Sequence, residues 1–166
     1  MSRTLILMRH AKSSWDAPEL SDHDRPLNAR GRASATAMGG WLRTRGHVPH
    51  TCISSSATRT GQTFAHLALE VPVRFTRNLY HADPGTMMQV LHRQHEAVVL
   101  MLGHNPGIAA FAHRLVRTAP QHGRFADYPT AATTVIHWNV ERWDAIGWGQ
   151  GDVQDFAIPR EVLGDS

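Results

Sequence analysis

Short apolar runs recur along the chain and predict the strands of a sheet. The run at residues 5–8 is followed at once by polar Arg9 and His10, and residues 97–102 form the clearest central strand. Continuous apolar runs of this length are typical of strands that are buried on both faces. The predicted strands are residues 5–8, 51–54, 73–75, 97–102, 132–140 and 153–158.

Between these runs, apolar residues recur at helical spacing and predict helices. Asn28 is a suitable N-cap for the first helix, which Gly46 ends, and Asp83 is a suitable N-cap for a later one. The pair Gly39-Gly40 weakens the first helix near its far end. The predicted helices run from Asn28 to Gly46, over residues 58–69, over residues 84–92 and after Gly107.

The alternation of strands and helices predicts an α/β fold. We expect a three-layer α/β/α sandwich with a mostly parallel central sheet and helices on both faces. A length of 166 residues fits one domain, which we expect to span residues 1–166. Residues 11–27 are polar and rich in Ser, Asp and Pro, which indicates a long loop. In such sheets, ligands bind outside the carboxyl ends of the strands.

Polar clusters follow three of the predicted strands at that end of the sheet. Because the chain holds 12 histidines, a single histidine is weak evidence of a function, and the convergence of several clusters is stronger. The clusters are Arg9-His10 after the first strand, Ser54-Ser55-Ser56 with Arg59 after the second, and His104-Asn105 after the fourth.

These side chains suit the transfer of a phosphoryl group without a metal. The transition state spreads negative charge over three oxygens, and the guanidinium groups of Arg9 and Arg59 can bind such oxygens in pairs. A neutral imidazole, here His10, can act as the nucleophile. The G-x-x-x-x-G-K-[ST] pattern is absent from the sequence, which argues against a P-loop nucleotidase.

The same residues resemble the motifs of a known family. Arg9-His10-Ala11 resembles the Arg-His-Gly signature of the histidine phosphatase superfamily, the phosphoglycerate mutase-like proteins. Residues 54–63 and 103–107 resemble its second and third motifs, in the family's order. Residues 24–27 and Arg30-Gly31 further resemble the SixA-type phosphohistidine phosphatase branch.

The resemblance implies a phosphoglycerate mutase-like fold, no cofactor and a phosphohistidine intermediate on His10. Arg9 and Arg59 would bind the phosphate, and His104 would be a charged donor to the phosphoryl oxygens. Two further residues are expected at the substrate. Asn28 aligns with a small polar residue of the family, and Arg25 either shapes the pocket or is a surface charge. Ala11 replaces the family's glycine, which costs little unless that residue needs a positive φ.

The family's leaving-group acid has no clear match in this chain. Asp83 is the nearest acid and the candidate general acid, although we prefer its role as a helix N-cap. A positioned acid typically contributes about 10²–10⁴-fold, but a phosphohistidine releases an imidazole, which leaves readily. We therefore expect a metal-independent phosphatase that acts on phosphohistidine in a protein. The alternatives are a phosphomonoesterase on a small phosphorylated metabolite and a phosphate-binding module without turnover.

Composition limits the classes of binding partner and the cellular compartment that we expect. The net charge of +3 is compatible with an anionic substrate, but it is too small to indicate a nucleic-acid-binding protein. No apolar run reaches the roughly 18 residues of a membrane span, and Cys52 has no partner for a disulfide, so we expect the cytoplasm. We expect a phosphorylated substrate, such as a phosphohistidine-carrying signalling protein, and no membrane or nucleic-acid partner. The remaining histidines, including His81, are assigned to the surface or the core, and we expect no metal site.

Overall fold

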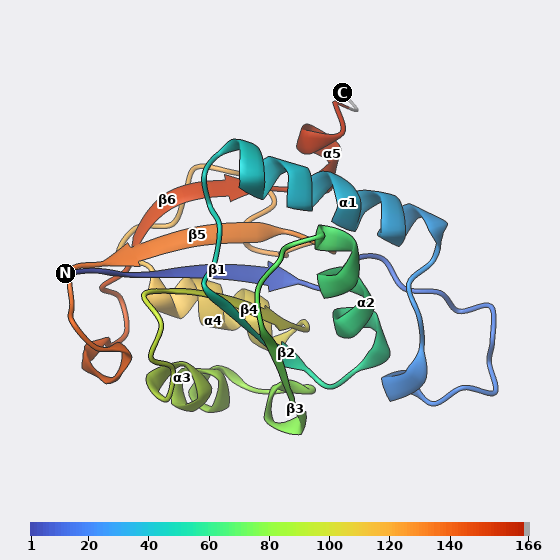
Figure 1. Ribbon diagram of the computed structural model, residues 1–166, viewed down its shortest axis with the longest axis horizontal. Coiled ribbons are helices and arrows are strands. Elements are labelled where there is room, and N and C mark those ends of the chain that lie inside the picture. The colour runs from blue at the N-terminus through green and yellow to red at the C-terminus, as the bar shows by residue number, and fades with distance from the viewer. Residues whose placement is uncertain (165–166) are drawn as a thin grey trace.

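The computed structural model describes residues 1–164 and has the predicted α/β fold. Within these residues, six strands form one sheet in the order β3-β2-β4-β1-β5-β6 (Figure 1). Every strand except β5 runs in the same direction, because β5 is antiparallel to β1 and β6 is antiparallel to β5. The strands are β1 (Arg3–Arg9), β2 (Thr51–Ser55), β3 (Val73–Thr76), β4 (Val98–Gly103), β5 (Thr133–Trp138) and β6 (Asp152–Ala157).

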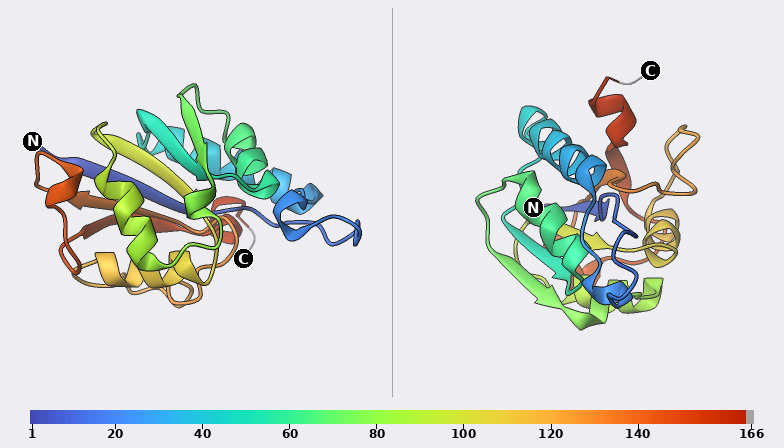
Figure 2. Two further views of the ribbon diagram at one scale, coloured as in Figure 1. Left: turned by 90° about the horizontal axis from the view of Figure 1, so that it is seen from below. Right: turned by 90° about the vertical axis from the view of Figure 1, so that its right-hand side faces the viewer.

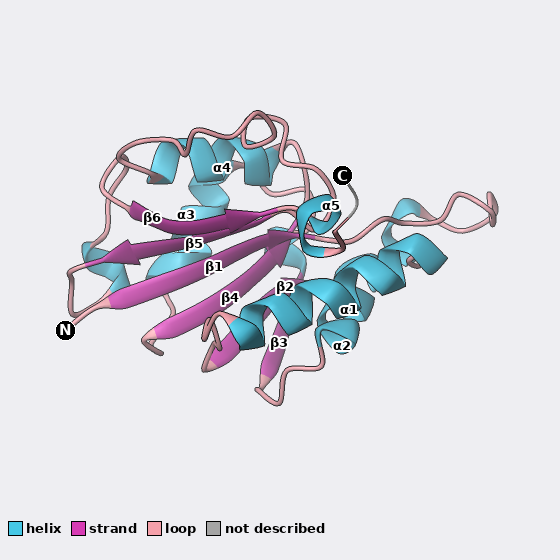
Figure 3. Cartoon of the chain, turned by 90° about the horizontal axis from the view of Figure 1, so that it is seen from above, coloured by secondary structure: helices cyan, strands magenta, loops and turns pink. Residues whose placement is uncertain are grey.

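Helices cover both faces of the sheet, which confirms the three-layer prediction. Figure 3 shows the sheet between α1 and α2 on one side and α3 and α4 on the other. The short helix α5 was not predicted from the sequence. No helix in the described part of the chain is long and apolar enough to cross a membrane. The helices are α1 (Ala29–Thr44), α2 (Thr58–Leu67), α3 (Pro84–His92), α4 (Gly107–Leu115) and α5 (Pro159–Val162).

The core has two parts, one on each face of the sheet. Along β1, Leu5 and Leu7 belong to the part that includes α3 and α4, whereas Ile6 and Met8 belong to the part that includes α1. Side chains alternate between the two faces of a strand, so a strand covered on both faces needs a continuous apolar run. This requirement is why the apolar run at residues 5–8 predicted a buried strand.

The long loop between β1 and α1 lies at the carboxyl ends of the parallel strands. Figure 2 shows this loop, in dark blue, extending beyond that end of the sheet. It contains a short 3-10 turn, η1 (Asp22–Asp24), and ends at Asn28, whose side chain accepts a hydrogen bond from Gly31 N at 2.8 Å. The predicted N-cap is thereby confirmed, and the loop is the segment nearest to the predicted site.

A glycine allows α1 to approach α2 closely. A Cβ atom on Gly39 would overlap the backbone carbonyl of Leu67 at the end of α2, whereas one on Gly40 would meet only the distant end of Arg43. The helix continues through both glycines to Thr44. Gly39 is therefore required by packing, and Gly40 has no such role.

This difference between neighbours gives a stability test. We expect Gly39→Ala to lower the free energy of unfolding by about 1–3 kcal/mol, because a backbone overlap must be relieved. Gly40→Ala is the matched control and should raise it by about 0.5–1 kcal/mol through helix propensity. Urea unfolding of both variants measures the two changes, and equal changes would contradict the proposed contact between α1 and α2.

Candidate active site

A pocket of about 350 Å³ lies at the carboxyl ends of β1, β2 and β4. The four residues predicted to be catalytic all line it, and so does the predicted substrate-binding residue Arg25. The four are Arg9, His10, Arg59 and His104. The pocket is therefore where the parallel-strand rule places a ligand.

His10 is held in place by its backbone on both sides. Its N–H donates to the carbonyl of Gly103 at 3.1 Å, and its own carbonyl accepts from the N–H of Ala131 at 2.9 Å. The ring Nδ1 lies 2.7 Å from the carbonyl oxygen of Ala11. Because a carbonyl can only accept, Nδ1 carries the proton and Nε2 keeps its lone pair.

Burial keeps the ring of His10 neutral. His10 is only 5% exposed. The loss of solvent around its ring is the main cause that lowers the pKa of His10 to about 3. The hydrogen bond to Ala11 opposes the shift, while the charges of Arg9 and Arg59 add to it. Ala11 itself is buried and is not among the residues with positive φ, so its replacement of the family's glycine causes no strain.

The pocket contains buried polar atoms that lack a partner. Within the described chain these include Nε of Arg9, Nε of Arg59 and Nδ1 of His104. Buried polar atoms of native proteins nearly always have a hydrogen-bond partner, so these three are exceptions within the site. Arg9 and Arg59 both line the pocket, and their guanidinium ions favour an anion as its ligand.

His104 lies beside His10, and burial lowers the pKa of its ring. The two ring centres are 5.2 Å apart, and Nε2 of His104 lies 2.8 Å from the hydroxyl of Ser55. Desolvation by burial, followed by the nearby His10 and Arg59, lowers the pKa of His104 well below its usual range. Burial thus favours the neutral ring in the pocket without substrate, whereas the charge of His104 beside a bound phosphoryl group stays a prediction.

Arg25 is a buried part of the pocket wall. Its Nη1 donates to the hydroxyl of Ser13 at 2.8 Å and to the carbonyl of Ser14 at 3.1 Å. Its guanidinium also lies 3.5 Å from the ring centre of Trp15, in cation–π geometry. Of the two roles considered for Arg25, the structure favours shaping the pocket over a free surface charge.

Two predicted site residues lie outside this pocket. Asn28, expected to contact substrate, is instead the N-cap of α1. Asp83, the candidate general acid, is the N-cap of α3, where its Oδ1 accepts from Thr86 N at 2.7 Å. Neither side chain lines the pocket around His10. For both residues, the structure confirms the helix N-cap that the sequence predicted.

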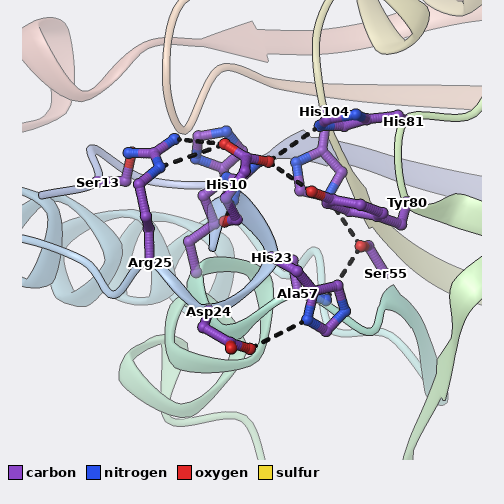
Figure 4. A network of polar contacts seen from close by, with 12 residues as sticks. His10, Ser13, His23, Asp24, Arg25, Ser55, Ala57, Tyr80, His81 and His104 are labelled. Carbon is purple, nitrogen blue, oxygen red and sulfur yellow. Dashed lines mark hydrogen bonds and ion pairs between the residues drawn. The ribbon is translucent and has the colours of Figure 1, made fainter. Parts of the chain in front are cut away.

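Three residues of the site were missed by the sequence analysis: Asp22, Tyr80 and His81. Oδ2 of Asp22 accepts from the hydroxyl of Tyr80 at 2.6 Å and lies 3.2 Å from Nε2 of His81. Figure 4 shows Arg25, Tyr80 and His81 converging on one centre beside His10. No sequence pattern marks this cluster, since Asp22 and Tyr80 are 58 positions apart. His81, assigned to the surface or core, lines the pocket.

Asp22 also connects two of the three arginines that line the pocket, Arg25 and Arg59. Arg59 donates from Nη1 to the backbone carbonyl of Asp22 at 2.7 Å and from Nη2 to its Oδ2 at 3.1 Å. Arg25 donates from Nε and Nη2 to Oδ1 at 3.3 and 3.2 Å. Residues 1–164 contain no cluster of three or more His, Cys, Asp or Glu side chains arranged to hold a metal ion.

Sequence comparisons connect the chain to known proteins. A profile of the histidine phosphatase superfamily (branch 1) matches residues 5–92, more than half of the chain. An uncharacterized protein of Mycobacterium tuberculosis is 34% identical over 161 residues, which is 92% of this chain and 100% of the relative. A similar protein of Mycobacterium leprae is 34% identical over 163 residues, with the same coverage.

Structural comparisons agree with the sequence. A proposed phosphohistidine phosphatase SixA of Nakamurella multipartitia has a TM-score of 0.80 and 31% identity, and the match covers 96% of this chain and 97% of that one. A corresponding protein of Agrobacterium tumefaciens has a TM-score of 0.77 and 26% identity, with 95% and 98% covered. These matches confirm the predicted fold and the predicted enzyme class, a phosphatase. The chain belongs to the histidine phosphatase superfamily.

Proposed function

We propose that this protein is a metal-independent phosphatase that removes the phosphoryl group from phosphohistidine in a protein substrate. The observation that carries the proposal is the pocket itself. Among residues 1–164, it combines a neutral nucleophile, three arginines and no carboxylic acid placed to hold a proton. Such a site stabilises the charge of a phosphoryl group but does little for a poor leaving group.

The reaction would proceed in two displacements on phosphorus. In the first, Nε2 of His10 forms a bond to phosphorus while the P–N bond of the substrate breaks, and the leaving nitrogen takes the electron pair. In the second, a water oxygen bonds to phosphorus, the bond to Nε2 breaks, and the water proton passes to solvent. Arg9 and Arg59 neutralise the phosphoryl oxygens throughout, which is the role that metal ions take in other phosphoryl-transfer sites.

The acids near the pocket support an activated substrate. Asp83 caps α3 outside the pocket. Burial alone would raise the pKa of Asp22, but the hydrogen bonds from Tyr80 and Arg59 outweigh it and hold this pKa far below its usual range. Asp22 is therefore ionised at neutral pH and has no proton to give. An imidazole leaving group needs such a proton much less than an alkoxide does.

Features around the pocket favour a macromolecular substrate. Trp15 lines the pocket and is 75% exposed, as expected for a residue that contacts a partner. An adjoining hollow shares Lys12 with the pocket and is also lined by Arg30, Arg124 and Arg160, which suits an acidic protein surface. The names of the SixA structural neighbours support phosphohistidine as the group that is dephosphorylated. The lone, buried Cys52 supports the cytoplasm as the compartment.

The nucleophile can be tested by substitution and trapping. We expect His10→Ala to abolish turnover of a phosphohistidine protein, since no other group replaces the attacking nitrogen. Rapid acid-free quenching of the wild type should trap a phosphate that is acid-labile and base-stable, located on residue 10 by mass spectrometry. More than a small residual rate in the variant, with the fold intact by circular dichroism, would remove His10 from its role.

Metal independence and substrate class can be measured together. In buffer containing EDTA, we expect unchanged turnover of a phosphohistidine protein and a much lower kcat/KM for a primary alkyl phosphate. The reason is that arginines supply the positive charge and no acid protonates the alkoxide. Loss of activity in EDTA, restored by a divalent cation, would refute metal independence. A faster alkyl phosphate would indicate a phosphomonoesterase.

The charge state of the nucleophile predicts a pH dependence. The pKa of His10 is about 3 in the folded chain, whereas the pKa of a histidine in an unfolded chain is about 6.5. The unfolded state therefore binds more protons in this window, and the free energy of unfolding should fall as the pH drops from 6.5 toward 3. NMR of the His10 C2 proton should show no titration between pH 8 and 5, with a urea-unfolded sample as the control.

A further inference from the structure

Asp22 is the one acidic residue among the described residues that line the pocket. Its carboxylate lies in contact with groups from three parts of the chain: the loop after β1, helix α2 and the turn after β3. These groups are Arg25, Arg59, Tyr80 and His81. A negative charge in a pocket built to bind phosphate opposes the binding of that phosphate, so its presence needs a reason.

The position of Asp22 places its charge on the outer side of the pocket. Its side chain is 40% exposed, whereas that of its partner Arg59 is 4% exposed. His10 is buried in the same way. In an in-line displacement, the leaving group departs on the side of phosphorus opposite the attacking atom. With Nε2 of His10 at the bottom, the leaving group departs toward the mouth, where Asp22 lies.

This carboxylate interacts in opposite ways with the two kinds of leaving group. When the P–N bond of a ring-protonated phosphohistidine breaks, the nitrogen takes the electron pair and the cationic ring becomes a neutral imidazole. When the P–O bond of an alkyl phosphate breaks, the oxygen takes the pair and becomes an alkoxide. Relative to the free substrate, a nearby carboxylate stabilises the positive charge that the protonated ring still carries in the transition state, and it repels the negative charge that grows on the alkoxide.

We propose that Asp22 is the specificity-determining residue of the pocket, because its carboxylate favours a phosphoryl donor whose imidazole ring is protonated before the P–N bond breaks and disfavours an alkoxide leaving group. This inference rests on the proposed function, since it assigns the substrate preference of that same site. It differs from a general acid: Asp22 transfers no proton, and its effect is electrostatic. It also differs from a purely positioning role, in which Asp22 would only hold Arg59.

The test compares two substrates in three proteins. Wild type, Asp22→Asn and Asp24→Asn are assayed with phosphoimidazole and with a primary alkyl phosphate. Asparagine keeps the size of Asp22 and an acceptor oxygen for Arg59 but removes the charge. Asp24 is the matched control, because it lies in the same 3-10 turn, its side chain is 61% exposed, and its ion pair is with His23 instead of an arginine.

We expect Asp22→Asn to reduce kcat/KM for phosphoimidazole by about tenfold or more while that for the alkyl phosphate stays within about threefold or rises. Asp24→Asn should leave both values unchanged. A parallel fall for both substrates in Asp22→Asn, together with weaker binding of inorganic phosphate by calorimetry, would show that Asp22 only positions Arg59. That result would overturn the inference and leave the proposed function intact.

A second measurement needs no variant and covers the case in which Asp22→Asn does not fold. Wild type is assayed at pH 8.5 with neutral phosphoimidazole and with its permanently cationic N-methyl derivative. After division by the uncatalysed hydrolysis rates, we expect the cationic donor to be preferred. Preference for the neutral donor would overturn the inference alone. Absence of turnover with either donor and with a phosphohistidine protein would overturn the proposed function, and this inference with it.

Discussion

The hydrogen bond from Nδ1 of His10 to the carbonyl of Ala11 determines which ring nitrogen can react. It leaves Nε2 with a free lone pair without the help of a carboxylate. The bond depends on the sheet, because the backbone of His10 is held by Gly103 on one side and by Ala131 on the other. The tautomer of the nucleophile thus follows from the placement of β1 between β4 and β5.

A phosphate pocket without its ligand has to accommodate like charges at short range. Arg9, Arg25 and Arg59 line the same space, and each repels the others. A neutral His10 adds no further charge, and the carboxylate of Asp22 offsets part of what remains. The balance stays positive, which is the condition for attracting an anion.

The parts of the protein that were predictable from sequence are those set by local patterns. Apolar runs revealed the strands because a doubly covered strand must be apolar throughout, and the polar residues after those strands gave the centre of the site. Capping preferences correctly placed Asn28 and Asp83 at helix starts. The lowered pKa of His104 could not be predicted, because the burial that causes it has no local signature in the sequence. Asp22 and His81 were missed because a loop brings them together across the fold.

The pocket divides into two parts that come from different segments of the chain. The sheet and α2 hold His10, Arg9 and Arg59, which meet the phosphoryl group in the proposed reaction, whereas the loop between β1 and α1 supplies Arg25 and Asp22. Changes in that loop that keep the contacts between Asp22 and Arg59 would therefore alter what is released without disturbing how phosphorus is attacked. A single surface segment would then let relatives of this fold diversify, and let an engineer exchange their selectivity by grafting loops.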